Sequence, residues 1–355
     1  MAQSPLIIAH RGASGERPEH TRAAYLLAVE QGADVIEPDL VLTKDGVLVD
    51  RHENEIGGTT DVADWPEFAD RKTTRIIDGV ETPGWFTEDF TLAELKTLRA
   101  RERLPAFRPA SAAFDGQEPI LTFDEVVAIA REASTRTGRT IAVAPELKHP
   151  AYFASIGLPM EDRFVAELAR LGLTGADAPI IVQCFEVGPL ERLSRRIDVP
   201  LAQLVSPTGG PADRPGLTYA EMLTPQGLGS VAAYADWLAP EMTLVLPRDA
   251  EGRSTAPSAL VAEAHALDGH RDHLGPAGVE HRAQLRRGGV LARPGQETGG
   301  EGAISGLFVY SRALTFRTRA SIFFFHSLAH FSGLRSHRNL GQSGVCLLFL
   351  RKYFR

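Results

Sequence analysis

Four charged residues in this sequence occur as two pairs with a spacing of two, Glu37 with Asp39 and Glu146 with Lys148. Side chains at positions i and i+2 of a β-strand point to the same face, so each pair can point into one pocket at the end of a strand. Such a pair is ordinary on a solvated sheet face, but charges that face the inside of a barrel are strongly unfavourable unless they are paired or bound to a metal. The spacing therefore favours a functional site.

Two histidines lie where such a pocket would need groups that take up and release protons. His10 ends the first predicted strand, and His52 closes the hairpin that follows the first charged pair. Imidazoles at strand ends of a barrel lie on the rim that carries active sites, and they can act as base and acid near neutral pH. A lone histidine is more often structural or exposed, and we prefer that interpretation for His20, His149 and His265.

Parallel βα units must position these residues. Up to about residue 265, short β-rich runs alternate with helix-like stretches, which is typical of a parallel α/β fold. Strands are predicted at 6–9, 34–41 and 47–49, the last two joined by the short turn 43–46. Six barrel strands can be counted, the sixth at 235–240. The fold class is therefore predicted to be an α/β, TIM (β/α)8-type barrel.

Two long segments depart from this alternation. Residues 53–118 form a polar insertion after the second strand, with a single helix-like piece at 92–101, and we expect it to act as a lid or substrate-selecting subdomain. Residues 268–355 hold 13 Lys+Arg and 5 Asp+Glu, whereas the whole chain has 38 and 45. We predict a barrel domain at 1–266 and an atypical basic tail at 267–355, either disordered or produced by a reading-frame change, with the last strands of the barrel missing or replaced.

The bulk composition limits the possible partners. The hydrophobic content of 43% is that of a soluble globular protein, and the formal charge of −7 gives no reason to expect a nucleic-acid partner. Cys184 and Cys346 lie far apart, which suggests neither a disulfide framework nor a zinc site. No apolar run reaches the length of a transmembrane segment. The N-terminus lacks a secretory signal, so a cytoplasmic location is expected, or a periplasmic one if the true start lies upstream.

The motifs, taken in order, resemble the glycerophosphodiester phosphodiesterase family, within the phosphatidylinositol-specific phospholipase C-like barrels. The resemblance runs from about residue 5 to 265 and is closest to the bacterial periplasmic-type branch. The matching segments are Ala9-His10-Arg11-Gly12, Pro18-Glu19 with Thr21, 32–39, 43–49, 52–56, 58–63, 85–92, Pro145-Glu146-Leu147-Lys148 and Tyr234-Ala235-Asp236.

The resemblance implies hydrolysis of a small-molecule glycerophosphodiester to sn-glycerol 3-phosphate and an alcohol. It implies that a divalent cation is held by Glu37, Asp39 and Glu146. Three carboxylates form a hard, all-oxygen site, which agrees with Ca2+ or Mg2+ as the bound ion, and Ca2+ is the one that we expect. Arg11 and Lys148 would bind the phosphate. His10 and His52 would be general base and general acid, in either order, and the nucleophile would be water or the glycerol 2-hydroxyl of the substrate.

The sequence departs from the family pattern at two places. Glu19-His20-Thr21 stands where Glu-Asn-Thr is expected, and no Trp/Tyr-Thr pair or Gly-Val-Phe-Thr-Asp-like segment follows residue 265. These departures leave open the hypothesis that the chain is a catalytically dead product of a damaged gene, or a barrel kept only for binding. A lipid phosphodiesterase of the same superfamily is a further hypothesis, since Trp85-Phe86 and the apolar tail offer apolar groups for contact with a membrane. The sequence does not fix the oligomeric state or the head-group preference.

Overall fold

The computed structural model describes residues 6–266 of the 355-residue chain. The predicted basic tail at 267–355, and with it the fate of the last barrel strands, lies outside the described residues. The division of the chain into a barrel domain and a tail stays a prediction.

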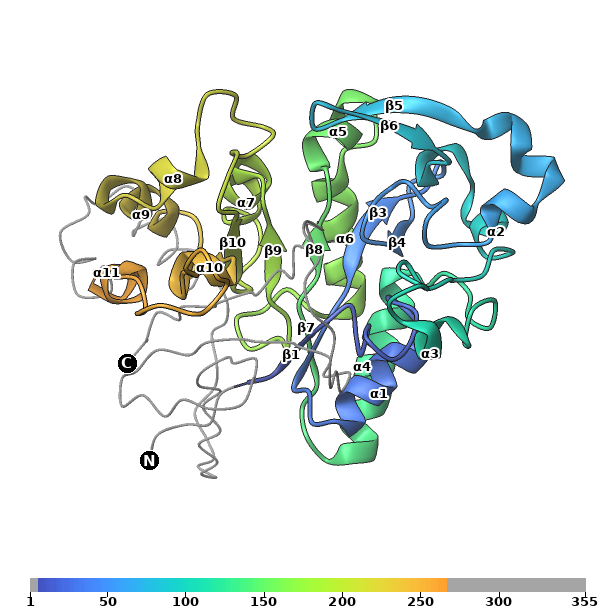
Figure 1. Ribbon diagram of the computed structural model, residues 1–355, viewed down its shortest axis with the longest axis horizontal. Helices are drawn as coiled ribbons and strands as arrows, with labels where there is room; N and C mark the ends of the chain where they lie inside the picture. Colours follow the sequence, from blue (N-terminus) through green and yellow to red (C-terminus); the bar gives the residue numbers. More distant parts are fainter. Residues whose placement is uncertain (1–5, 267–355) are drawn as a thin grey trace, which may run out of the picture.

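Parallel strands form the centre of the described part, and helices flank them (Figure 1). The pairings β1 with β2, β2 with β7, β3 with β8, β8 with β9, β9 with β10, and β10 with β11 are all parallel. β2 and β3 together count as one barrel strand, and so do β7 and β8. With β1, β9, β10 and β11, they form the first six strands of the predicted barrel, each parallel to the next in chain order. The strands are β1 (Ile8–His10), β2 (Val35–Glu37), β3 (Asp39–Leu42), β4 (Leu48–Asp50), β5 (Thr73–Ile77), β6 (Val80–Gly84), β7 (Ala142–Val143), β8 (Glu146–Leu147), β9 (Val182–Cys184), β10 (Leu201–Val205) and β11 (Trp237–Pro240).

Two prolines interrupt the strands next to the charged pairs. Pro38 lies between β2 and β3, and Pro145 lies between β7 and β8. Proline has no N–H group and cannot donate to a strand ladder, so each run is divided where it carries a carboxylate. The strand predicted at 34–41 is therefore two strands, and its second half forms the expected antiparallel hairpin with β4.

The helices occupy the connections between strands. They are α1 (Arg22–Glu30), α2 (Leu92–Leu95), α3 (Pro109–Ala112), α4 (Phe123–Thr137), α5 (Pro150–Ser155), α6 (Met160–Leu171), α7 (Val187–Leu193), α8 (Tyr219–Met222), α9 (Pro225–Ala232), α10 (Met242–Val245) and α11 (Leu260–Ala266). Short 3-10 helices are η1 (Val62–Asp64), η2 (Pro66–Arg71) and η3 (Thr87–Asp89). Among residues 6–266, no helix is both long enough and apolar enough to span a bilayer.

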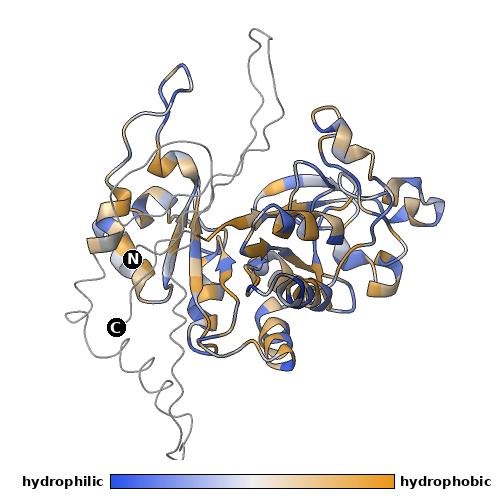
Figure 2. Cartoon of the chain, turned by 90° about the horizontal axis from the view of Figure 1, so that it is seen from below, coloured by the Kyte–Doolittle hydropathy of each residue, from blue (hydrophilic) through white to orange (hydrophobic). Residues whose placement is uncertain are grey.

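Helix α4 illustrates how the sequence sets these elements. Thr122 accepts a hydrogen bond from the backbone of Glu125, whose carboxylate bonds back to the Thr122 backbone, and Gly138 ends the helix with a φ of 66°. The ring of Phe123 packs against that of Phe164 on α6, with 5.6 Å between the ring centres. Apolar residues gather on the central strands, while the helices carry both apolar and polar residues (Figure 2).

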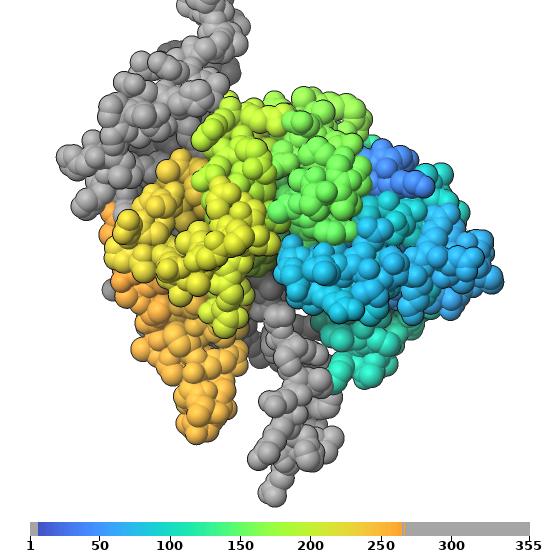
Figure 3. Space-filling model, turned by 90° about the horizontal axis from the view of Figure 1, so that it is seen from above, coloured from blue at the N-terminus to red at the C-terminus, as the bar shows by residue number. Residues whose placement is uncertain are grey.

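The insertion at 53–118 has more regular structure than the sequence analysis predicted. The helix predicted at 92–101 was too long, because only Leu92–Leu95 is helical. The sequence analysis also missed α3, three 3-10 helices and the antiparallel hairpin of β5 and β6. The tip of that hairpin reaches the segment after β8, where His149 Nδ1 lies 2.6 Å from Asp78. Figure 3 shows the insertion, coloured blue to teal, side by side with the segment that follows β8, coloured green.

Candidate active site

Three buried carboxylates converge where the prolines divide the strands. Glu37 ends β2, while Asp39 and Glu146 begin β3 and β8 and are partners in the parallel register. Each offers one oxygen, these oxygens lie within 4.8 Å of one another, and each residue is at most 5% exposed. Oδ1 of Asp39 is buried without a hydrogen-bond partner. A buried carboxylate oxygen without a hydrogen-bond partner is available as a ligand for a hard divalent cation. The three residues therefore fit the predicted metal site.

Mutual repulsion perturbs this cluster. Burial and the negative charges of Asp39 and Glu146 raise the pKa of Glu37 well above its usual range. Burial, partly offset by Lys148, raises the pKa of Glu146 to about 7. Burial opposes the ionisation of Asp39 as well, but His52, His20 and Lys148 outweigh it and hold the pKa of this carboxyl well below its usual range. The three groups therefore need a cation or protons to coexist.

The first motif folds around Glu37. His10 ends β1 opposite Glu37 in the register, and the backbone N–H of Arg11 donates to Glu37 Oε2 at 2.9 Å. At this contact the backbone is left-handed at Arg11 and at Gly12, with φ of 61° and 80°. A Cβ on Gly12 would lie 2.7 Å from the backbone of Ala24, so glycine also allows the motif to approach α1 closely.

The side chain of Arg11 is held near the carboxylates but keeps one free donor. Its Nη1 lies 3.4 Å from Glu19 Oε2 and its Nε 3.5 Å from Asp39 Oδ2. Nε is buried without a hydrogen-bond partner, and the residue's side chain is 11% exposed. A guanidinium with an unused donor beside the cluster is suited to bind an anion that enters there.

His52 and Lys148 complete the predicted set. Lys148 Nζ donates to Glu146 Oε1 at 2.9 Å and lies 3.4 Å from Nε2 of His52. The other ring nitrogen of His52, Nδ1, forms a short hydrogen bond with Glu53. Burial and the positive charge of Lys148 lower the pKa of His52 to about 4, and burial with the charge of Arg11 lowers that of His10 well below its usual value. All seven predicted site residues therefore gather around one cluster.

The structure brings two further residues to this site that the sequence analysis did not select, one in contact with the carboxylate cluster and one beside it. Gln183, fully buried on β9, donates from Nε2 to Glu37 Oε1 at 2.9 Å, and its own Oε1 has no partner. Arg103, from the insertion, binds Glu53 and Glu19. Gln183 could have been selected from the sequence, because it is a polar residue inside a buried strand. Arg103 could not, because its partners are far away in the sequence.

His20 is structural rather than exposed. Its ring is fully buried, with Nε2 3.0 Å from Asp39 Oδ2 and Nδ1 2.7 Å from Asp50 Oδ1. Burial opposes its charge, but Asp50 and Asp39 outweigh this effect and raise the pKa of His20 to about 9. Its φ of 57° is a left-handed conformation in which asparagine, the residue expected from the family, is common. His149 pairs with Asp78, and His265 lies in α11.

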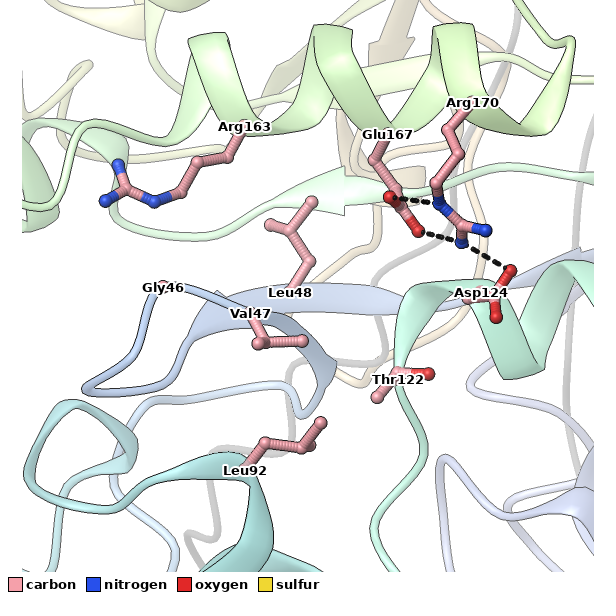
Figure 4. A pocket seen from close by; sticks show the side chains of 9 residues that line it. All are labelled: Gly46, Val47, Leu48, Leu92, Thr122, Asp124, Arg163, Glu167 and Arg170. Atoms are coloured by element: carbon pink, nitrogen blue, oxygen red, sulfur yellow. Dashed lines mark hydrogen bonds and ion pairs between the residues drawn. The ribbon is translucent and has the colours of Figure 1, made fainter.

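A separate pocket lies on the outside of the β3–β4 turn (Figure 4). Leu48 and Leu92 line it, and Arg170 on α6 bonds Glu167 and pairs with Asp124 across it. None of the predicted catalytic or metal-binding residues lines this pocket.

Comparison with solved structures identifies the fold. A crystal structure from Silicibacter pomeroyi matches with a TM-score of 0.54 at 22% identity, covering 75% of this chain and 81% of that one. The predicted TIM-barrel-type α/β fold is confirmed.

Comparison of sequences identifies the family. The sequence model of the glycerophosphoryl diester phosphodiesterase family matches residues 10–266. A relative from Arabidopsis thaliana, the glycerophosphodiester phosphodiesterase GDPD6, is 38% identical over 74% of this chain and 72% of its own length. The glycerophosphodiester phosphodiesterase of Haemophilus influenzae is 27% identical over 70% and 72%. The chain belongs to the glycerophosphoryl diester phosphodiesterase family, which is a family of enzymes, and the predicted resemblance is confirmed.

Proposed function

We propose that this chain hydrolyses glycerophosphodiesters to sn-glycerol 3-phosphate and an alcohol, with a divalent cation held by Glu37, Asp39 and Glu146. The observation that carries the proposal is the buried three-carboxylate cluster, with the orphaned Asp39 oxygen beside two cationic side chains. When bound there, the cation supplies positive charge that polarises a phosphoryl oxygen and stabilises negative charge in the transition state. Ca2+ suits a cluster of carboxylate oxygens from separate strands better than Mg2+, which demands near-ideal octahedral geometry.

Arg11 and Lys148 receive the phosphodiester. Arg11 offers its unpartnered Nε, and Lys148, directly after β8, reaches the cluster while it is paired with Glu146. Both cations are nearly buried, with side chains 11% and 9% exposed, so their attraction for a phosphate is screened less than on an open surface. Together they offset the repulsion between the carboxylates and the anionic substrate.

His10 and His52 transfer the protons, and we assign His10 as general base and His52 as general acid. The lowered pKa values of both rings favour neutral imidazoles in the ligand-free site, which suits a base. A bound phosphodiester opposes the charges of Arg11 and Lys148, which favours a proton on one ring. Glu53 binds Nδ1 of His52, so Nε2 is the atom that faces Lys148 and the substrate.

The nucleophile is either water or the glycerol 2-hydroxyl of the substrate. Attack by the 2-hydroxyl would give a cyclic phosphodiester that water then opens. Turnover of a 2-deoxy analogue at the rate of the natural substrate would exclude the internal nucleophile.

The proposal is tested by release of sn-glycerol 3-phosphate from glycerophosphocholine by the purified 355-residue chain, with Ca2+, with Mg2+ and with chelator. We expect cation-dependent turnover that is lost in His10→Ala. Absence of turnover from soluble, folded protein would favour the inactive-protein hypothesis. Turnover of a lysophospholipid in place of glycerophosphocholine would favour the lipid phosphodiesterase hypothesis.

A further inference from the structure

One arginine of the insertion reaches two acidic residues of the catalytic motifs. Arg103 lies in the chain between α2 and α3, outside any helix or strand. Its guanidinium donates to Glu19 from Nε at 3.0 Å and from Nη2 at 2.6 Å. It donates to Glu53 from Nη1 at 3.0 Å and from Nη2 at 2.6 Å. Two paired contacts to two carboxylates use the planar fork of an arginine, and a lysine cannot reproduce them.

Each of these carboxylates holds a predicted catalytic-site residue in turn. Glu53 binds Nδ1 of His52, which directs Nε2 of that ring toward Lys148. Glu19 lies 3.4 Å from Nη1 of Arg11, whose Nε is the free donor beside Asp39. One side chain from the insertion is therefore connected to the proton-transfer group and to the phosphate-binding group.

Removal of the guanidinium would change what these carboxylates bind. Glu19 is 4% exposed, so it cannot turn to water and would keep only the contact with Arg11 among its ion pairs. A stronger pull by Glu19 would move Arg11 away from Asp39 and from the phosphate position. Glu53 is 34% exposed and, once released by Arg103, is free to rotate into solvent and leave Nδ1 of His52 without its partner.

We propose that Arg103 is a positioning residue through which the insertion holds His52 and Arg11 in their working orientations. This inference rests on the proposed function and goes beyond it, because Arg103 touches neither the carboxylate cluster nor the predicted catalytic histidines. It assigns the insertion a role in assembling the site, in addition to any part it has in covering the substrate.

The test compares Arg103→Met and Arg103→Lys with a matched control, Arg101→Met. Arg101 lies two residues away and pairs with Asp64 at the surface, where the two side chains are 38% and 61% exposed. We expect Arg103→Met to lower kcat and raise KM, with kcat/KM falling at least about tenfold, the size associated with loss of a charge-assisted hydrogen bond. Arg103→Lys should recover only part of this loss, and the control should stay within about twofold of the wild type.

Two single substitutions separate the two connections. Glu53→Gln should reproduce mainly the fall in kcat and alter the pH profile, and Glu19→Gln should reproduce mainly the rise in KM. If Arg103 has only a structural role, Arg103→Met should lower the melting temperature and the fraction of active enzyme. The effects of the two glutamine substitutions should then not divide between kcat and KM. Wild-type kinetics in Arg103→Met, or an equal loss in Arg101→Met, would overturn the inference.

An NMR measurement of the His52 ring distinguishes failure of this inference from failure of the proposed function. Nitrogen-15 shifts of the ring report which nitrogen carries the proton, and they need no turnover. We expect a changed tautomer balance in Arg103→Met and none in Arg101→Met. If the wild type is inactive but the shifts respond as expected, the proposed function fails and the positioning role stands; unchanged shifts overturn the positioning role in either case.

Discussion

The buried charge of His20 predicts a specific dependence of stability on pH. Its pKa of about 9 in the folded protein lies above the ordinary value of 6.5. Stabilisation by His20 is therefore fully present below the lower value and is lost as pH rises through the higher one. A difference of about 2.5 units corresponds to about 3 kcal/mol of unfolding free energy. The origin is geometric, since both ring nitrogens face carboxylates, Asp39 and Asp50.

Urea unfolding of the wild type and of His20→Asn, both with chelator, measures this contribution. Asparagine accepts the left-handed backbone at this position, so the substitution removes the charge with little backbone strain. The stability advantage of the wild type should be about 3 kcal/mol larger near pH 6 than near pH 10. The control is His149→Asn, which removes an imidazole from another left-handed position, with φ of 51°. An advantage that does not vary with pH, or that varies equally in the control, would refute the reasoning.

Three other predictions concern the same site. Ca2+ at about 100 times its dissociation constant should raise the melting temperature by about 5–10 °C in a thermal scan, because it relieves repulsion among the carboxylates, and Glu146→Gln should remove most of this shift. Calorimetry should find tighter cation binding above pH 7 than below it, since the pKa of Glu146 is about 7 and protons compete for the site. Gln183→Leu should weaken cation binding about tenfold by the same assay, because Glu37 loses the donor that orients it; unchanged affinity would contradict this role.

The parts of the fold and site that depend on local pattern were predictable from the sequence. The strands carrying Glu37, Asp39 and Glu146 were expected from β-rich runs, and the i, i+2 spacing with a parallel register brings these carboxylates together. The β5–β6 hairpin was missed although Asp78-Gly79, between two runs of strand-forming residues, is a strong hairpin signal. The roles of the catalytic residues stay predictions.

The remaining parts depend on tertiary contacts that no local pattern encodes. His20 was assigned a structural or exposed position because the sequence does not reveal that Asp39 and Asp50 lie on either side of its ring. Arg103 sits in a polar stretch with several other arginines, and only the folded chain brings it to Glu19, 84 positions away. Residues that orient catalytic groups are thus harder to find from sequence than the catalytic groups themselves.

The contact between Gln183 and Glu37 also has a consequence for synthesis of the chain. These residues are 146 positions apart, so a ribosome adding about 5–20 residues per second needs roughly 7–30 s between them. For most of that interval, until Glu146 and Lys148 follow, Glu37 and Asp39 have been synthesised without the residues that complete the cluster. We therefore expect a nascent chain to gain cation affinity in two stages, first when β8 has left the ribosomal tunnel and then, by about tenfold, when β9 and Gln183 follow.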